Sequence, residues 1–415
     1  MIETLSYDVA IIGGGAAGLF AAKETASAGC STLVIDREKR TGGILNQCIH
    51  PGFGLHCFKK ELTGPEFAAE ADLQAKYAGA DFRLDTTVRE IKRQADGTVL
   101  LDLASGEYGI STLHAKAVIL TAGCRERNRG NLAIPGKRPA GVWTAGSAQK
   151  LMNINGMLPG KRAVIVGSGD IGLIMARRLT WSGVKVLAVI EILPHPSGLI
   201  RNIAQCLEDF NIPLYLSHSV VDIRGSEHVS GISAAPLVNG VPDMEKQIHF
   251  DCDTVLFSVG LIPSNELIIP LGAAIDPATN GAVVDSNGET TVPGLFSAGN
   301  VRHVHDLVDF VAEEAAETGR AVVRKLKGTM PAPAYQAHKN GALRYVIPSR
   351  FAPGEMTHFR FRPVISAERC ELTAISNGKV IQRWTEHFVN PAEMIQVQLE
   401  TPAADVTFEL NEVKK

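Results

Sequence analysis

Three glycines near the start of the chain have the spacing of a nucleotide-binding turn. Gly13, Gly15 and Gly18 follow the apolar segment YDVAII, and an alanine-rich helical stretch comes next. A second apolar segment ends in Asp36, 18 residues after Gly18. Glycines permit the tight turn, the approach of a pyrophosphate and close helix–strand packing, and a carboxylate at a strand end can accept hydrogen bonds from a ribose. The stretch 7–36 therefore predicts a βαβ unit that binds a dinucleotide.

The same pattern recurs at residues 161–191. Gly167, Gly169 and Gly172 stand between an apolar strand and a helical stretch, and Glu191 follows Gly172 by 19 residues. A carboxylate at this strand end favours a free ribose diol and repels a 2′-phosphate, so we expect NADH rather than NADPH. Two alternatives stay open: a vestigial site that no longer binds nucleotide, and a Glu191 that is only a solvated strand end.

Two cysteines follow the first turn, in the stretch GGILNQCIHPGFGLHC at 42–57. A redox dithiol brings two sulfurs together, usually from CxxC or from cysteines four residues apart, whereas eight residues separate Cys48 and Cys57. A loop could still join them, but we expect buried loop thiols. Cys48 alone is a candidate thiolate, for a charge-transfer contact or for oxidation to a sulfenate. Weaker candidates, with loop structure as their default, are Gln47, His50 and Cys124.

The hydrophobic pattern shows the elements that must position these groups. Residues 86–91, 98–103 and 113–123 are typical of short strands, and 291–300 is typical of a strand that ends in small residues. A helical pattern begins near Asp306, which we expect to cap the helix. His303 and His305 come just before it. They could supply a proton or a hydrogen bond to a bound group, or lie in a solvent-facing loop.

Composition excludes several classes of protein. The chain has 415 residues, 45% of them hydrophobic and 20% charged, which suits two or three domains with their own cores. A net charge of -3 gives no basic field for nucleic acid. Seven scattered cysteines indicate neither a disulfide framework nor a metal site, so we expect a cytoplasmic protein. The N-terminus lacks the pattern of a signal peptide, and no uncharged run reaches the roughly 20 residues of a membrane span.

With these motifs, the TAG segment at 121–123 and GLFSAGN at 294–300, the chain resembles the flavoprotein superfamily that has two dinucleotide-binding domains, over about residues 5–330. The resemblance implies an α/β fold with two Rossmann-like three-layer domains, the NAD domain inserted in the FAD domain. It places the FAD domain at 1–155 and 285–330 and the NAD(H) domain at 156–284. Residues 331–415 alternate with period two, which predicts a small C-terminal antiparallel β module.

The resemblance also implies the cofactors, FAD and NAD(H), and the residues that hold them. In the superfamily the late segment ends in Gly-Asp, whereas this chain has Gly299 and Asn300, and an amide can still hydrogen-bond a ribityl hydroxyl. Cys48 and His305 are the expected catalytic residues, the helix near Asp306 is expected to point its positive end at the flavin, and no metal is expected. The expected cofactor-binding residues are Gly13, Gly15, Ala16, Ala17, Gly18, Asp36, Arg37, Gly42, Gly43, Val88, Ala122, Gly123, Gly167, Gly169, Gly172, Glu191, Gly260, Gly299 and Asn300.

A narrower resemblance, carried by residues 42–67, 299–314 and the β-rich tail, is to a group associated with an FAD-dependent glycerol-3-phosphate dehydrogenase. We expect an FAD-dependent oxidoreductase that exchanges two electrons between NAD(H) and a second donor or acceptor, without a redox disulfide. The partner would be a small molecule or another flavoprotein. Two alternatives are the flavin subunit of a dehydrogenase complex, for glycerol 3-phosphate or an amino or hydroxy acid, and a flavin-binding structural subunit without turnover. The tail could pack or mediate a hetero-complex or homo-oligomer.

Overall fold

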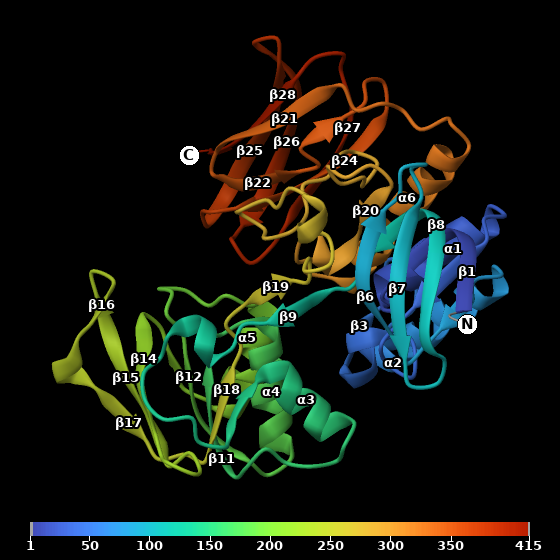
Figure 1. Cartoon of the computed structure of the whole chain (residues 1–415). Helices are drawn as coiled ribbons and strands as arrows, with labels where there is room; N and C mark the ends of the chain where they lie inside the picture. The colour runs from blue at the N-terminus through green and yellow to red at the C-terminus, as the bar shows by residue number, and fades with distance from the viewer. Residues whose placement is uncertain (1–2, 414–415) are drawn as a thin grey trace. The chain divides into compact units, whose positions relative to one another are not determined.

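The computed structural model describes residues 3–413 and divides into two compact units (Figure 1). Unit 1 holds the described residues up to Cys124 and from Pro263 onward, and unit 2 runs from Arg125 to Ile262. These bounds differ from the expected 156–284. Unit 2 starts earlier because β10 (Val142–Thr144) pairs with β18 (Thr254–Phe257) of its sheet. It ends earlier because apolar residues between 268 and 284 pack into the core of unit 1.

A seven-stranded sheet forms the centre of unit 1, in the order β5-β2-β1-β8-β7-β6, with β20 also paired to β8. The pairs among β5, β2, β1, β8 and β20 are parallel, and β6, β7 and β8 form an antiparallel meander. Fully buried runs such as TLVI in β2 suit parallel strands that are covered on both faces. The strands are β1 (Glu3–Ile12), β2 (Thr32–Ile35), β5 (Asp81–Arg83), β6 (Thr86–Arg93), β7 (Val99–Ser105), β8 (Gly109–Leu120) and β20 (Leu295–Ser297).

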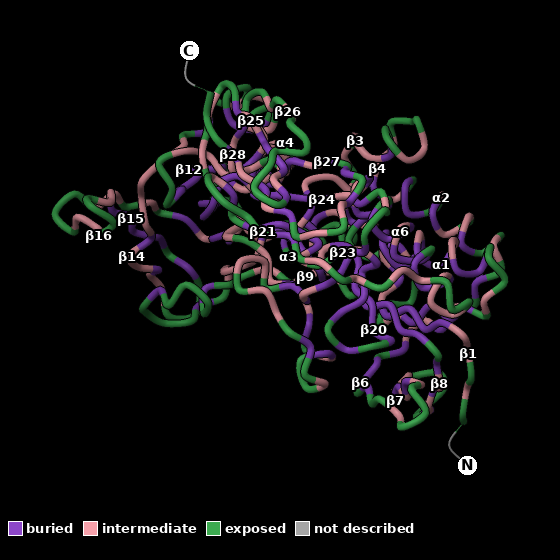
Figure 2. Tube along the Cα trace, turned by 90° about the horizontal axis from the view of Figure 1, so that it is seen from above, coloured by how far each residue is buried: buried purple, intermediate pink, exposed green. Residues whose placement is uncertain are grey.

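Three helices cover one face of this sheet: α1 (Ala16–Ser27), α2 (Gly64–Tyr77) and α6 (Val308–Leu326). Helix α1 packs against both α2 and α6, and small side chains such as Ala21 and Ala315 allow the close approach. The Thr63–Glu66 capping box fixes the start of α2. The buried trace in Figure 2 runs through α6 and β20, so these elements belong to the core.

Unit 2 has its own parallel sheet, in the order β10-β18-β11-β12-β13. Helices pack on one face and an antiparallel sheet packs on the other, which gives three layers. The α/β class with Rossmann-like sheets is therefore confirmed. The remaining elements are α3 (Ala145–Asn153), α4 (Asp170–Trp181), α5 (Ile200–Cys206), β11 (Arg162–Val166), β12 (Lys185–Ile190), β13 (Leu214–Tyr215), β14 (His218–Arg224), β15 (Gly231–Val238), β16 (Val241–Pro242) and β17 (Ile248–Phe250).

The C-terminal β module is built from two sheets around an aromatic core that includes Phe359 and Phe408. Most pairs are antiparallel, as expected, although β21 and β28 are parallel. The module is part of unit 1, because Tyr345 and Ile347 pack into that unit's core. Its strands are β21 (Tyr335–Gly341), β22 (Leu343–Ile347), β23 (Arg350–Phe351), β24 (Met356–Pro363), β25 (Ala367–Ser376), β26 (Lys379–Val389), β27 (Ile395–Glu400) and β28 (Val406–Glu412).

Short elements complete the chain. They are β3 (Pro51–Phe53), β4 (Leu62–Thr63), β9 (Cys124–Glu126), β19 (Leu261–Pro263) and 3₁₀ turns at Gly43–Gln47, Arg129–Leu132, Glu208–Phe210, Met244–Lys246, Ile269–Leu271 and Gly299–Val301. Among residues 3–413, no helix combines the length and the apolar character that crossing a membrane requires.

Candidate functional site

The first glycine turn joins β1 to α1, and its three glycines meet three different requirements. Gly13 has a φ of +110°, and a Cβ there would lie 2.5 Å from the Thr121 carbonyl oxygen. A Cβ at Gly18 would lie 1.8 Å from the Gly13 oxygen, so the close packing of α1 excludes any side chain. At Gly15, in contrast, no atom from elsewhere in the fold lies within 4 Å of the Cβ position. This open space is where a pyrophosphate can approach the backbone.

Helix α1 begins beside that space. Its N-cap residue is Gly15, no side chain caps it, and its first turn holds no acidic residue. The first N–H groups of a helix have no partner within the helix and favour an anion. The predicted positions Gly15, Ala16 and Ala17 therefore fit the phosphate groups of a dinucleotide.

Asp36 and the arm after it close on the same turn. The Asp36 carboxylate accepts hydrogen bonds from the N–H groups of Gly14 (2.6 Å) and Glu38 (2.8 Å), and the residue remains partly exposed. The Gly42 N–H donates to the Gly14 oxygen at 2.8 Å. The Cβ position of Gly43 is 3.3 Å from the Gly15 Cα. The turn, the acid and the arm thus form one cradle that fits the adenosine and pyrophosphate end of FAD.

Other predicted positions lie around this cradle in different ways. Thr121, Ala122 and Gly123 follow β8, and the Thr121 hydroxyl donates to the Gly13 oxygen at 2.8 Å. Arg37 is exposed. The Val88 side chain is buried in the sheet's hydrophobic core, so only its backbone is available to a cofactor.

The segment that holds Cys48 and Cys57 is fixed by an acid from another helix. The buried Asp309 of α6 accepts three backbone hydrogen bonds, from Gly54 (3.1 Å), His56 (2.9 Å) and Cys57 (2.8 Å). The Cys57 thiol lies 3.6 Å from the Asp309 carbonyl oxygen, to which it donates. A carboxylate with three convergent N–H donors is a strong clamp, so this loop is a structural part of unit 1.

Both sulfurs are thiols at neutral pH. Burial raises the pKa of the Cys48 thiol to about 12. Burial and the nearby Asp309 carboxylate raise the pKa of Cys57 as well. None of the seven cysteines, all within the described residues, is in a disulfide. The raised pKa disfavours the thiolate interpretation of Cys48, because only the thiolate is a good nucleophile or charge-transfer donor.

The second glycine turn, between β11 and α4, has the same tight glycines, but the first turn of α4 holds Asp170 and the Gly169 Cβ position is 3.3 Å from the Ser258 hydroxyl. Gly167 has a φ of +93°, and a Cβ there would lie 2.1 Å from the Ser258 oxygen. A Cβ at Gly172 would lie 2.7 Å from the Ser258 Cβ, and the Gly172 N–H donates to the Ser258 hydroxyl at 3.0 Å. Gly169 is the N-cap of α4. Gly260, after β18, accepts a hydrogen bond from the Arg127 N–H at 3.0 Å.

Glu191 is not a solvated strand end, because it is only 3% exposed. One of its carboxylate oxygens accepts from the Ser168 N–H (2.9 Å), the Ser168 hydroxyl (2.6 Å) and the Ser197 hydroxyl (2.9 Å). The other accepts from the Leu193 N–H at 3.0 Å. A carboxylate has about four acceptor positions, so little capacity is left for a ribose. Glu191 instead ties the glycine turn to the loop after β12 and keeps a negative charge at this edge.

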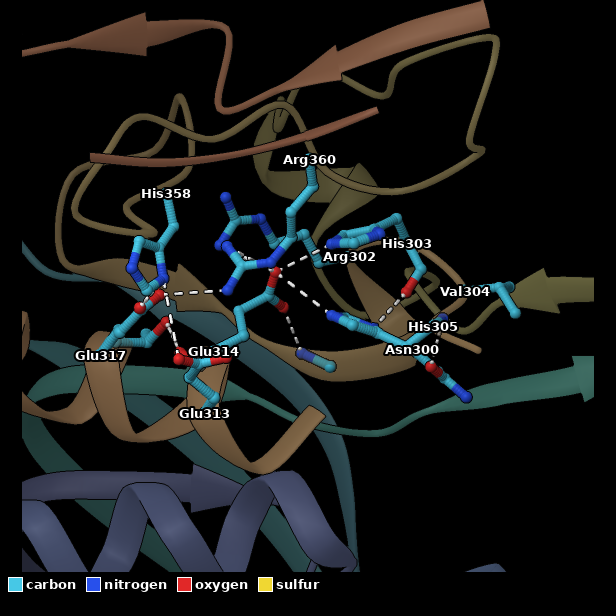
Figure 3. A network of polar contacts seen from close by, with 12 residues as sticks. Asn300, Arg302, His303, Val304, His305, Glu313, Glu314, Glu317, His358 and Arg360 are labelled. Carbon is cyan, nitrogen blue, oxygen red and sulfur yellow. Dashed lines mark hydrogen bonds and ion pairs between the residues drawn. The ribbon is translucent and has the colours of Figure 1, made fainter. Parts of the chain in front are cut away.

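A buried charge cluster lies at the start of α6 (Figure 3). We use this name for Arg302, His303, His305, Glu314 and Arg360, all buried. Their side chains converge on one Glu314 oxygen, at 3.4 Å from Arg302, 2.8 Å from His303, 3.5 Å from His305 and 3.7 Å from Arg360. Burial alone would raise the pKa of Glu314, but these cationic and imidazole groups hold it well below its usual value.

The two histidines are therefore not in a solvent-facing loop. His303 Nε2 donates to Glu314, while its Nδ1 is buried without a hydrogen-bond partner. Burial and the neighbouring His305 lower the pKa of His303 to about 3. His305 Nδ1 donates to the His303 carbonyl oxygen at 3.1 Å, and His305 Nε2 is buried without a hydrogen bond. The pair thus presents one imidazole fixed in its neutral form, His303, and a second, His305, whose Nε2 faces the Glu314 carboxylate at 3.5 Å.

These residues do not fit a metal ion. His303, His305 and Glu314 bring ligand atoms within 4.8 Å of one another. Two guanidinium groups, however, lie within 4 Å of the same Glu314 oxygen that a cation would need. Like-charge repulsion therefore disfavours a metal in this cluster.

Asp306 does not cap α6, contrary to our expectation. The helix N-cap is Leu307, and the Asp306 carboxylate pairs with Arg362 of β24 at 2.7 Å and accepts the Met394 N–H at 2.6 Å. The arginine of the β module offers a charged partner that a backbone N–H cannot match. The loop before α6 is thereby bound to the C-terminal module.

Sequence reasoning missed Glu314, Asp309 and the arginines that pair with them. One signal was present: Glu314 lies three residues after Val311 and four before Thr318, on the buried face of α6. An acid on a buried helix face needs a partner. The partner Arg360 is 46 residues away in sequence, so nothing local identifies it.

Comparisons with known proteins agree with this arrangement. The sequence profile of the pyridine nucleotide-disulphide oxidoreductases matches residues 7–339. Hydrogen cyanide synthase subunit HcnB of Pseudomonas protegens is 27% identical over 72% of this chain. An opine oxidase subunit of Agrobacterium tumefaciens is 26% identical over 71%. The chain spans 66% and 61% of the length of these two relatives.

A solved structure supports the fold as well. The thioredoxin reductase of T. acidophilum superposes with a TM-score of 0.63 and 26% identity, over 78% of this chain and 99% of that one. The profile match covers both glycine turns and the cradle described above. The chain belongs to the pyridine nucleotide-disulphide oxidoreductase family, and this membership implies that it is an FAD-dependent oxidoreductase.

Proposed function

We propose that the protein exchanges two electrons between NAD(H), bound by unit 2, and a second donor or acceptor through FAD bound by unit 1, without a redox disulfide. The observation that carries this proposal is the duplicated glycine turn. Each unit has its own sheet with a set of parallel strands, and the turn lies at the carboxyl end of a central parallel strand. This is the edge at which open α/β sheets bind nucleotides.

The charge at the second turn supports NADH over NADPH. Glu191 is a buried carboxylate at the end of β12, 2.9 Å from the Ser168 N–H in the turn. A negative charge there repels a 2′-phosphate even when it makes few contacts with a ribose. The proposed preference therefore rests on electrostatics and not on a ribose hydrogen bond.

The state of the cysteines supports a reaction without a dithiol. Cys48 and Cys57 are held as thiols, and Asp309 fixes their loop through three backbone N–H groups. FAD and NAD(H), when bound, supply the hydride-transfer chemistry. The chain's own contribution is to hold pyrophosphate at the two turns and to exclude water. We propose that His305, buried with its Nε2 3.5 Å from the Glu314 carboxylate, supplies a hydrogen bond to the bound flavin.

Anaerobic reduction of the bound flavin tests the proposal. NADH is expected to bleach the flavin absorbance at least tenfold faster than NADPH. As a matched variant, Gly169→Ala alters the second turn, since its Cβ would lie 3.3 Å from the Ser258 hydroxyl and needs only a small shift of that side chain. This variant should lose reduction by NADH and keep reduction by dithionite. Unchanged absorbance with both nucleotides in the unaltered protein would refute the NAD(H) assignment.

A second candidate is the flavin subunit of a dehydrogenase complex that oxidises glycerol 3-phosphate or an amino or hydroxy acid at the flavin. It is favoured by the names of the two curated relatives, both of which are called subunits. The C-terminal module also presents an exposed edge strand, β26, with Ile381 and Phe388 on the surface. Such an edge can pair with another chain.

Copurification tests this second candidate. A partner lost from the double variant Ile381→Lys, Phe388→Asp, while FAD stays bound, would support a complex through β26. Flavin reduced by one of these donors would identify the substrate class. Protein that stays oxidised with NADH, NADPH and every donor would instead favour a structural subunit that binds flavin without turnover.

A further inference from the structure

Arg360 is a charged side chain from the C-terminal module that lies inside the flavin-binding unit. It comes from β24 and is 1% exposed, which is unusual for an arginine. One of its Nη atoms lies 3.7 Å from Glu314, and the other donates to Glu317 at 3.3 Å. Burial disfavours the cation, but these two carboxylates raise the pKa of Arg360. The module therefore contributes a fixed positive charge to α6.

Glu314 carries that interaction to the cofactor cradle. Its second oxygen accepts the Gly299 N–H at 2.8 Å. Gly299 has a φ of +78°, and its Cβ position is 2.8 Å from the Ala17 Cβ in the first turn of α1. The segment that begins at Gly299 thus packs directly on the helix start that fits pyrophosphate. Asn300 Oδ1 accepts the His305 N–H at 3.0 Å, so the whole loop is tied together.

We propose that Arg360 is a positioning residue for FAD: it holds Glu314, and through Glu314 the Gly299–His305 loop, against the cofactor cradle. This inference rests on the FAD binding in the proposed function. Figure 3 shows Arg302 and Arg360 converging on the Glu314 carboxylate. Without Arg360, Glu314 would keep one guanidinium partner and Glu317 would lose its arginine. Removing one partner of a buried ion pair leaves an uncompensated charge that rearranges its surroundings.

The alternative is that Arg360 only fastens the module to α6. Other contacts already do so, since Arg362 pairs with Asp306 at 2.7 Å and His358 pairs with Glu317 at 2.5 Å. A fastening role predicts a lower melting temperature and an unchanged flavin. A positioning role predicts a flavin whose oxidised and reduced forms are bound with altered relative affinity.

The test measures the flavin midpoint potential of the full-length holoprotein by titration with dithionite. Arg360→Met removes the charge at similar volume, and Arg360→Lys keeps it without the second branch to Glu317. The matched control is Arg383→Met, which removes an ion pair to Glu371 within the module on the exposed strand β26. Dithionite reduces the flavin without NADH. If NADH does not reduce the flavin, the proposed function is refuted, but the midpoint potential can still be measured.

We expect Arg360→Met to weaken binding of reduced relative to oxidised FAD about tenfold, a fall of about 30 mV for a two-electron couple. The midpoint potential of Arg360→Lys should fall by about half as much, and that of Arg383→Met should match the potential of the unaltered protein. A relative affinity within twofold of the unaltered protein in Arg360→Met, whatever its melting temperature, overturns the proposal. If Arg360→Met does not fold, an unshifted potential in Arg360→Lys overturns it.

Discussion

Substituting Gly15 should separate cofactor binding from folding. Gly15 has a φ of -77° and a ψ of -169°, which alanine and valine adopt without strain, and no atom from elsewhere in the fold lies within 4 Å of its Cβ position. Replacing glycine by alanine at the N-cap destabilises the folded helix by about 1 kcal/mol or less. The same change restricts the unfolded chain, which stabilises the folded state by about 0.4–1 kcal/mol. The free energy of unfolding of the apoprotein should therefore change by less than about 1 kcal/mol, or about 3 °C in melting temperature.

The effect on FAD should be much larger. A methyl group at Gly15 fills the space through which pyrophosphate reaches the N–H groups at the start of α1. Each hydrogen bond to a charged group contributes about 1.5–3 kcal/mol, so the loss of one should weaken FAD binding about 10- to 100-fold. Valine occupies more of the space and should abolish stoichiometric binding.

Flavin fluorescence on titration with apoprotein measures the dissociation constant, and thermal melting of the same apoprotein checks the fold. Gly18→Ala is the contrasting variant, because its Cβ would lie 1.8 Å from the Gly13 oxygen and should destabilise the apoprotein itself. Full FAD occupancy with an unaltered flavin spectrum in Gly15→Val would refute the assignment of this turn to the pyrophosphate.

Three further predictions concern the buried acids, imidazoles and thiols. Asp309→Asn should lower the free energy of unfolding by about 2 kcal/mol, because an amide cannot accept hydrogen bonds from three N–H donors. It should also speed alkylation of Cys57, because the Asp309 carboxylate raises the pKa of that thiol. An unchanged alkylation rate would contradict this. Because folding lowers the pKa of His303 to about 3, the unfolded chain binds one more proton between about pH 6.5 and 3, and stability should fall by about 1.4 kcal/mol per pH unit on acidification in that range. Urea unfolding of His303→Gln should show a slope smaller by that amount, and equal slopes would count against a neutral His303. Cys48→Ser should leave the flavin spectrum and NADH oxidation unchanged, since its pKa of about 12 keeps the sulfur protonated, and loss of a long-wavelength absorbance band would show a thiolate after all.

Local patterns in the sequence were sufficient for much of the fold. The glycine turns depend on backbone geometry within a few residues, so Gly13 and Gly167 have the positive φ values that the motif requires. Period-two alternation located β24, β25, β27 and β28 because each of these strands has one face on the aromatic core, and it also located the mostly exposed β26. The bounds of unit 2, Arg125–Ile262, differ from the expected 156–284, since the partners of β10 and of residues 268–284 lie far away in sequence.

The charges of the site could not be assigned in this way. Glu191 has the predicted spacing, yet the serines that occupy its oxygens were not part of the motif. Asp306 has the right type and position for a helix cap, but an arginine from the C-terminal module takes its carboxylate. Rules based on local sequence assume that a carboxylate binds the nearest free backbone N–H. Asp306 instead binds a guanidinium from a distant strand, because an ion pair is the stronger interaction.

The cluster around Glu314 also changes what the C-terminal module can be. A module that served only as a surface for another chain would meet α6 through apolar contacts and exposed ion pairs, which contribute little. Instead Arg360 is 1% exposed and reaches a carboxylate that also binds the Gly299 N–H. Burying these charges is unfavourable unless all are paired, so the module and the Gly299 loop must adopt their positions together. Substitutions in the module that move β24 are therefore expected to change the flavin midpoint potential through Glu314, whereas substitutions on β26 are expected to leave it unchanged.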